Sequence, residues 1–122
     1  MHELSIAHSL VELAADAAER AGVSRISVVH LRLGALAGVV RDALEFGFAI
    51  AADGTALAGA RLVVAELPVR IFCPRCQAEA ELPDIQRFCC PACGTPAGQI
   101  VQGRELELAA LEYEDDPASA PA

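Results

Sequence analysis

The sequence CPRC at residues 73–76, followed after thirteen residues by CPAC at residues 90–93, decides the fold of the middle of this chain. Each Cys-x-x-Cys turn can present two thiolates to one ion, and two such turns complete the tetrahedral sulfur site that structural Zn²⁺ prefers. An iron–sulfur cluster and a redox dithiol are the alternatives for this pattern. We predict that zinc is bound by four thiolates, those of Cys73, Cys76, Cys90 and Cys93. A closed site of this kind performs no catalysis and stabilises the fold of its segment.

A fifth cysteine, Cys89, directly precedes Cys90. Ligation through Cys89 would lengthen the second turn to Cys-x₃-Cys, which is less regular, so we assign the site to Cys90 and Cys93. We expect Cys89 to pack beside the site, with a reactive thiol as the alternative. An odd number of cysteines confined to residues 73–93 favours metal binding in a reducing compartment over a disulfide framework.

Hydrophobic periodicity on both sides of the cysteine segment predicts two helices and three strands. The expected elements are, in order, a helix at 4–21, a strand at 25–34, a helix at 39–52, and strands at 60–67 and 99–113. We place four residues on the buried face of the first helix: Ile6, Leu10, Leu13 and Ala17. The second helix is apolar on two sides and is therefore expected to be widely buried.

The cysteine segment begins and ends between two strands, so it is most simply an insertion. The fold expected is α+β, a three-stranded mixed sheet with two helices, plus an inserted four-cysteine zinc-ribbon domain. We expect residues 1–70 and 99–114 to form one α/β domain and residues 71–98 to form the zinc-binding domain. The acidic end, residues 115–122, is expected to be a disordered tail.

The composition excludes several classes of function. The chain has 122 residues, with 17 acidic side chains against 9 basic ones and a formal net charge of -8. This charge disfavours non-specific binding to nucleic acid and to anionic membranes. The apolar stretches are too short to span a bilayer, and the N-terminus lacks the basic and apolar regions of a signal peptide. We therefore expect a soluble cytoplasmic protein.

The N-terminus carries a second set of metal ligands. The amine of Met1, together with the backbone nitrogen and imidazole of His2, can chelate one ion in fused rings, and Glu3 adds an amide and a carboxylate. A nitrogen-rich, nearly planar set suits Ni(II) or Cu(II). Taken alone the signal is weak, because a terminal histidine is usually just solvated. His8 falls on another side of the helix, and His30 is expected to be an ordinary strand histidine.

The motifs along the whole chain have a joint order and spacing that resemble those of the HypA/HybF family, the nickel metallochaperones of hydrogenase maturation. The matching residues, besides the two Cys-x-x-Cys turns, are Met1–Ser5, Leu33-Gly34, Gly38-Val39, Leu44–Phe46, Gly54-Thr55, Gly59–Leu62 and Gly103–Leu106.

The resemblance implies a nickel-binding α/β domain and a zinc-ribbon domain. Nickel would be held by the amine of Met1, the backbone and imidazole nitrogens of His2, and the backbone of Glu3. In some members of the family a histidine of the zinc domain also binds nickel, but residues 71–98 of this chain contain no histidine. Ni(II) would be cargo and Zn(II) structural.

The resemblance also implies the partners. Nickel would pass to the large subunit of [NiFe]-hydrogenase, with the help of the GTPase of the same maturation pathway. In some members the same delivery serves urease, whose maturation factors would then be partners. A homodimer is the candidate oligomer. On this interpretation the protein is not an enzyme and has no catalytic residues.

Two other functions compete with this interpretation. A zinc-ribbon module in transcription or translation would need a basic or aromatic face, whereas residues 71–98 carry only Arg75 and Arg87 against three acidic residues. An enzyme that uses Cys89 as a nucleophile would need a histidine or a carboxylate or amide partner, and the sequence places none beside it.

Overall fold

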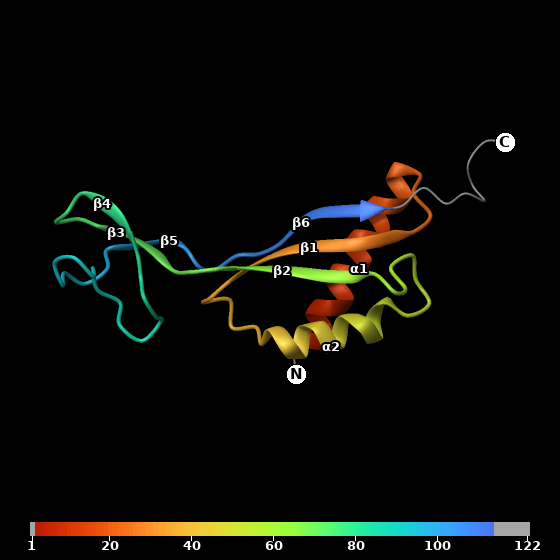
Figure 1. The fold of residues 1–122 in the computed structure, drawn as a ribbon, viewed down its shortest axis with the longest axis horizontal. Helices are drawn as coiled ribbons and strands as arrows, with labels where there is room; N and C mark the ends of the chain where they lie inside the picture. Colours follow the sequence, from red (N-terminus) through yellow and green to blue (C-terminus); the bar gives the residue numbers. More distant parts are fainter. Residues whose placement is uncertain (1, 114–122) are drawn as a thin grey trace. The chain divides into compact units, whose positions relative to one another are not determined.

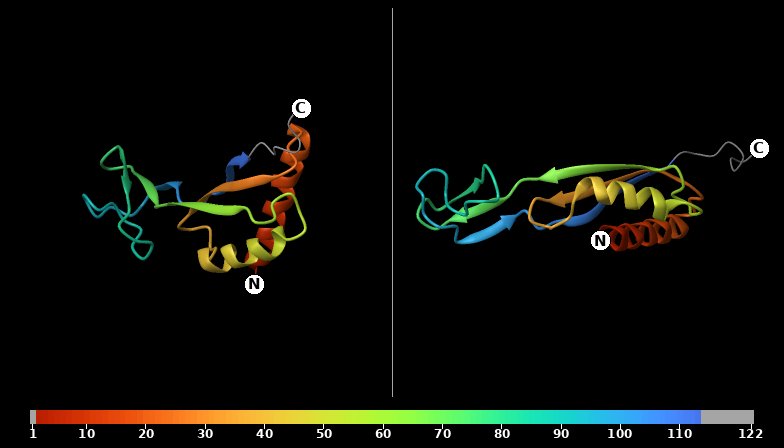
Figure 2. Two further views of the ribbon diagram at one scale, coloured as in Figure 1. Left: turned by 45° about the vertical axis from the view of Figure 1, so that its right-hand side comes forward. Right: turned by 90° about the horizontal axis from the view of Figure 1, so that it is seen from below.

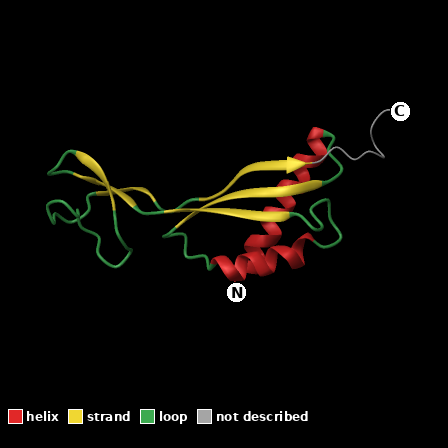
Figure 3. Cartoon of the chain, viewed as in Figure 1, coloured by secondary structure: helices red, strands yellow, loops and turns green. Residues whose placement is uncertain are grey.

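The computed structural model describes residues 2–113, and Figure 1 labels their helices and strands. In chain order these elements are α1 (His2–Ala21), β1 (Ile26–Gly34), α2 (Arg41–Ala52), β2 (Arg61–Leu67), β3 (Arg70–Cys73), β4 (Ala78–Glu81), β5 (Gln99–Gln102) and β6 (Leu106–Tyr113). The strands form two three-stranded sheets, β2-β1-β6 and β4-β3-β5 (Figure 3).

The described residues divide into two compact units. The helical unit comprises residues 2–31, 39–64 and 108–113, and the cysteine unit comprises residues 32–38 and 65–107. The domain boundaries expected from the sequence, with 1–70 and 99–114 in one domain and 71–98 in the other, stay a prediction. The predicted tail at 115–122 lies outside the described residues.

The sheet β2-β1-β6 is mixed. Strands β1 and β2 run in the same direction and β6 runs in the opposite one (Figure 1). Parallel neighbours need a long crossover connection, and α2 provides it between β1 and β2. Both helices lie on the same side of this sheet (Figure 2). The expected α+β fold, with a three-stranded mixed sheet and two helices, is thereby confirmed.

The single strand expected at residues 99–113 is wrong, because the structure divides it at Gly103. Gln99–Gln102 pairs with β3 as β5, and Leu106–Tyr113 joins the first sheet as β6. Gly103 has a φ of 133°, which extended strand residues do not adopt. A Cβ added at Gly34 would lie 2.2 Å from the Gly103 carbonyl oxygen, so only glycine fits at position 34.

The buried face of α1 is rotated relative to the predicted one. The buried apolar residues of this helix are Ala7, Leu10, Val11, Ala14 and Ala18, whereas Leu13 is 58% exposed. Small side chains on this face let α1 approach α2 closely. At the crossing, a Cβ on Gly47 would lie 3.3 Å from the Cα of Leu4, a contact that almost any larger residue would disturb.

The expectation that α2 is widely buried is also wrong. Leu44, Phe48 and Ala51 are buried, but Phe46 is 72% exposed and Ile50 is 52% exposed. Only one of the two apolar stripes of the helix therefore faces the core. Among the described residues, no helix is long and apolar enough to cross a bilayer.

Candidate metal sites

The structure brings together the sulfur atoms of four cysteines in the cysteine unit. The ligand atoms of Cys73, Cys76, Cys90 and Cys93 all lie within 4.8 Å of one another. The Sγ atoms of Cys73 and Cys93 are 3.6 Å apart, and those of Cys76 and Cys90 are 3.9 Å apart. Tetrahedral zinc with its usual Zn–S bond length places ligand sulfurs about 3.8 Å from one another. The cluster therefore fits a structural zinc ion.

The two Cys-x-x-Cys turns have the same backbone geometry. The N–H of Gln77 donates to the Cys73 carbonyl at 2.8 Å, and the N–H of Gly94 donates to the Cys90 carbonyl at 2.8 Å. The residue that follows each turn has a positive φ, 55° at Gln77 and 77° at Gly94. This repeated geometry directs two pairs of sulfurs toward one point.

A small apolar core packs against the four cysteines. Cys73 ends β3, which pairs with β4 and β5 in an antiparallel sheet. Val69, Ile71 and Leu82 are buried together with Cys73 and Cys90. Because this unit has so few large apolar side chains, much of its stability depends on a metal ion bound by the four cysteines.

Hydrogen bonds shift the pKa values of two thiols in the cluster in opposite directions. Hydrogen bonds with the side chain and the backbone of Thr95 lower the pKa of the Cys93 thiol to about 6. Hydrogen bonds with Cys93, Cys73 and Cys90 raise the pKa of Cys76 to about 12. Four thiolates at these separations repel one another, so only a cation allows all four to ionise together.

Cys89 lies outside this group. It is half-buried, forms an isolated β-bridge with Pro96, and lines a hollow of about 230 Å³ with Pro83 and Arg87. The described residues of the cysteine unit include no histidine, so Cys89 has no imidazole base within its own unit. The assignment of ligation to Cys90 and not Cys89 stays a prediction, and the sulfur geometry favours it.

The second predicted site begins α1. His2 is the first residue of the helix, and its side chain is 60% exposed. The first N–H groups of a helix have no acceptor one turn earlier, so the amides of His2 and Glu3 lie outside the regular helical ladder. Met1 lies outside the described residues.

Glu3 has a role that the sequence did not reveal, and this charged residue is only 5% exposed. Its Oε2 accepts a hydrogen bond from the Val40 N–H at 3.2 Å and lies 3.3 Å from Nε2 of His2. Val40 is the N-cap of α2 and has no side-chain cap of its own. The Glu3 carboxylate therefore links the start of α1 to the start of α2.

The environment of Glu3 strongly favours its ionised form. The pKa of the carboxyl group is lowered to about 2, first by a hydrogen bond from the terminal ammonium group and then by those from the N–H groups of Val40 and Glu3. A carboxylate held in this way is a poor candidate for exchange onto a metal. The backbone nitrogen of Glu3 is the more suitable ligand.

The other two histidines do not join a metal site in the described part of the chain. His8 is exposed on α1, and His30 is half-buried on β1, where its Nε2 contacts the carboxylate of Glu112. The four cysteines are the one group of three or more candidate ligands among residues 2–113.

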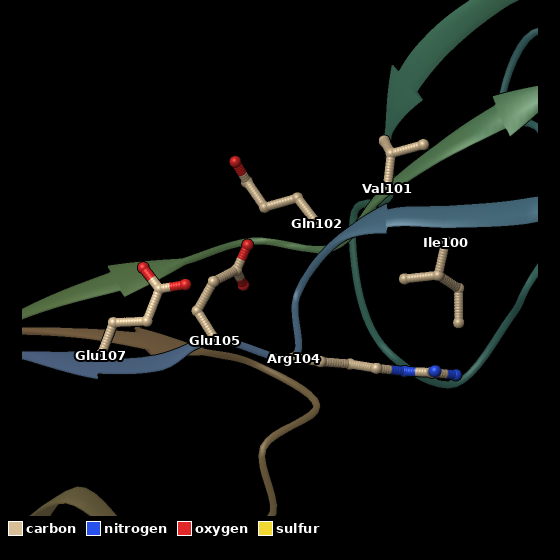
Figure 4. Close-up of a pocket in the computed structure, with 6 residues that line it drawn as sticks. All are labelled: Ile100, Val101, Gln102, Arg104, Glu105 and Glu107. Carbon is tan, nitrogen blue, oxygen red and sulfur yellow. The ribbon is translucent and has the colours of Figure 1, made fainter.

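A hollow of about 280 Å³ in the cysteine unit is lined by residues 100–102, 104, 105 and 107 (Figure 4). Three of its polar side chains already have partners. Glu105 accepts from the Gly103 N–H at 2.8 Å, Glu107 pairs with Arg32 at 3.2 Å, and Gln102 donates to the Pro68 carbonyl at 2.9 Å. These side chains therefore stabilise the junction between β5 and β6.

Comparison with known proteins gives one consistent result. The sequence model of one family, described as hydrogenase/urease nickel incorporation, metallochaperone, HypA, matches residues 1–113. A hydrogenase maturation factor HypA from Roseiflexus sp. is 60% identical over 122 residues, covering 100% of this chain and 99% of that protein. Another from Chloroflexus aurantiacus is 66% identical over 112 residues, covering 92% and 98%.

Two solved structures share the fold. The solution structure of a HypA protein has a TM-score of 0.71 at 22% identity, covering 95% of this chain and 98% of that one. The solution structure of the Ni metallochaperone HypA from Helicobacter pylori has a TM-score of 0.63 at 22% identity, covering 92% and 97%.

Proposed function

Because the chain belongs to the HypA family of nickel-incorporation metallochaperones, we propose that it binds one Ni(II) ion at its N-terminus and delivers it during [NiFe]-hydrogenase maturation. The recipient is the large subunit of the hydrogenase, and the GTPase of the same pathway takes part in the transfer. Urease maturation factors are the alternative partners, since the family serves both enzymes.

The nickel ligands are the amine of Met1, the backbone and imidazole nitrogens of His2, and the backbone nitrogen of Glu3. The observation that carries this assignment is the exposed His2 side chain at the first position of α1. A histidine that chelates together with its own amide nitrogen must use Nδ1, because Nε2 cannot reach the same ion. Four nitrogen donors in fused rings favour a planar geometry, which suits Ni(II).

The zinc ion is held by Cys73, Cys76, Cys90 and Cys93 and has a different role. A closed cage of four thiolates leaves no open position and exchanges its metal slowly. Ligands at an exposed chain end can instead be displaced one at a time by a partner. Nickel is therefore the cargo, and zinc holds the cysteine unit in its folded form.

The test compares two histidines on one helix. We expect His2→Ala to abolish stoichiometric nickel binding in titration calorimetry, whereas His8→Ala, which alters an exposed histidine of the same helix, binds one nickel per chain. Both variants should keep one zinc per chain. Unchanged nickel affinity in His2→Ala would refute the assignment.

The pH dependence gives a second test. Amine and imidazole must lose their protons to bind a metal, and their ordinary pKa values are roughly 8 and 6.5. Nickel affinity should therefore fall as the pH is lowered from about 8 to 6, while the zinc content stays constant. Nickel affinity that is independent of pH over this range would contradict the ligand set.

A further inference from the structure

We propose that the exposed apolar stripe of α2, continued by Leu4 of α1, is the surface on which the nickel-exchanging partner docks. The partner would offer an apolar groove with a basic rim. This inference rests on the proposed function, because it names the surface that brings a partner to the N-terminal nickel site.

The stripe consists of Ala43, Phe46 and Ile50, which are all exposed. Their spacing of three and seven residues places them on one side of the helix. This is the spacing of anchor residues when a helix binds in a groove on another protein. Phe46, at 72% exposure, is the most exposed large hydrophobic side chain among the described residues.

The stripe continues onto α1. A Cβ on Gly47 would lie 3.5 Å from the Cδ1 of Leu4, so the Leu4 side chain covers the flank of α2 beside the stripe. Leu4 is itself 43% exposed. Leu4 therefore adds a fourth exposed apolar side chain next to the stripe, and exposed apolar groups that gather in one place mark interaction sites.

The location of this surface connects it to the nickel site. Leu4 directly follows Glu3, and the Glu3 carboxylate holds the N–H of Val40, which is three residues before Ala43. Val40 is 61% exposed at this end of the stripe. A protein that covers the stripe therefore lies beside the first residues of the chain, where its own ligands can displace those of nickel.

The charge of the helical unit indicates which kind of protein surface would bind to the stripe. Its described residues carry eight acidic side chains against four arginines, a net charge of -4. Asp42 and Glu45 flank the stripe, and Glu45 already pairs with Arg41 at 2.8 Å. A second copy of this acidic unit would meet like charge, whereas a groove rimmed by lysine or arginine meets opposite charge.

The experiment compares two exposed apolar residues of the helical unit. Phe46→Arg places a cation in the stripe, and Leu13→Arg makes the same change at a 58% exposed position of α1, about 14 Å along the helix from Leu4. The probes are the purified GTPase of the maturation pathway and the purified hydrogenase large subunit. Binding of each probe to the nickel-loaded chain is measured by calorimetry.

We expect Phe46→Arg to weaken binding of the nickel-exchanging partner roughly tenfold or more, because a central aromatic anchor is lost. Leu13→Arg should bind like the unmodified chain, and wild-type affinity should fall as salt is raised. The proposal is overturned if Phe46→Arg binds both probes as tightly as Leu13→Arg, or if binding of the partner is independent of salt.

Two controls separate this inference from the proposed function. Phe46→Arg should still bind one nickel per chain, so a docking defect with intact nickel binding concerns the stripe alone. Light scattering reports the oligomeric state of the wild type and the variant. A wild-type dimer that Phe46→Arg converts to a monomer would make the occupant a second copy and overturn the proposal.

Discussion

Replacing Cys90 by serine should remove the zinc ion, whereas the same replacement at the adjacent Cys89 should not. The two residues are neighbours in the chain but differ in environment. Cys90 is 2% exposed with its sulfur 3.9 Å from that of Cys76, and Cys89 is only half-buried outside the cluster. A serine at position 90 leaves three thiolates, which cannot complete the tetrahedral sulfur site.

The loss of free energy is expected to be large because few other interactions stabilise the cysteine unit. The apolar cluster around the sulfurs has three buried aliphatic side chains, Val69, Ile71 and Leu82, which contribute about 5–9 kcal/mol in total if each contributes about 1.5–3 kcal/mol. A structural zinc site contributes about 10–16 kcal/mol. Loss of zinc therefore removes more free energy than these three side chains supply, and the residues around the cluster should unfold.

The assay combines metal analysis with amide spectra. In Cys90→Ser we expect zinc to fall from one per chain to near zero and the amide signals of residues 70–102 to lose their dispersion, while those of α1 and α2 remain. Cys89→Ser should keep its zinc and its spectrum. Retention of zinc by Cys90→Ser together with its loss from Cys89→Ser would refute the ligand assignment.

Other substitutions test the packing and the electrostatics. Gly34→Ala should lower the free energy of unfolding by about 3 kcal/mol or more, because the added Cβ would lie 2.2 Å from the Gly103 carbonyl oxygen. Denaturant unfolding measures this change, and a decrease under about 1 kcal/mol would contradict the close contact. Ile71→Ala, at a fully buried position, should lower the free energy of unfolding of the zinc-loaded protein by about 2–5 kcal/mol, and an unchanged value would count against the core. The lowered pKa of Glu3 stabilises the nickel-free helical unit above pH 4.5, and this stabilisation is lost as the pH falls toward 2. Glu3→Gln should therefore make the unfolding of α1 and α2 less dependent on pH over that range than in the wild type, and equal pH dependence would refute the role of Glu3.

Strong local signals allowed much of the fold to be predicted from the sequence. The alternation in 25–34 and the hydrophobic run of 60–67 correspond to β1 and β2, and Gly54, with a φ of 77°, follows the end of α2 as expected. The repeated Cys-x-x-Cys spacing predicted a four-sulfur cluster. These features are local, so they do not depend on which other segments the chain packs against.

The predictions from the sequence were wrong where packing between distant segments determines the structure. Leu13 and Ala17 fit the helical period of α1 as well as Ala14 and Ala18 do, and only close approach to α2 at Gly47 selects the alanine face. The short strands β3 and β4 have four residues each and no clear alternation. Pairing with one another beside the cysteine turns makes them strands.

Contacts between distant residues also determine features of the sites. The Glu3 carboxylate reaches Val40, 37 residues away, and nothing in the sequence around either residue indicates this bond. The hydrogen bond between Cys93 and Thr95, which lowers the pKa of Cys93, joins residues that are closer in sequence, and a hydroxyl residue two positions after a cysteine of the Cys-x-x-Cys turn could have suggested it.

We expect nickel binding by the chain terminus to depend on the position of the amine, which can be moved without altering any side chain. One glycine added before Met1 keeps His2 and Glu3 but displaces the terminal nitrogen from its chelate ring. We predict that the native chain binds one nickel and shows the absorption of a planar nitrogen-ligated Ni(II) ion. The extended chain should lose that absorption and bind nickel at least tenfold more weakly, with its zinc unchanged. Equal nickel affinity and an identical spectrum in the two chains would contradict the claim.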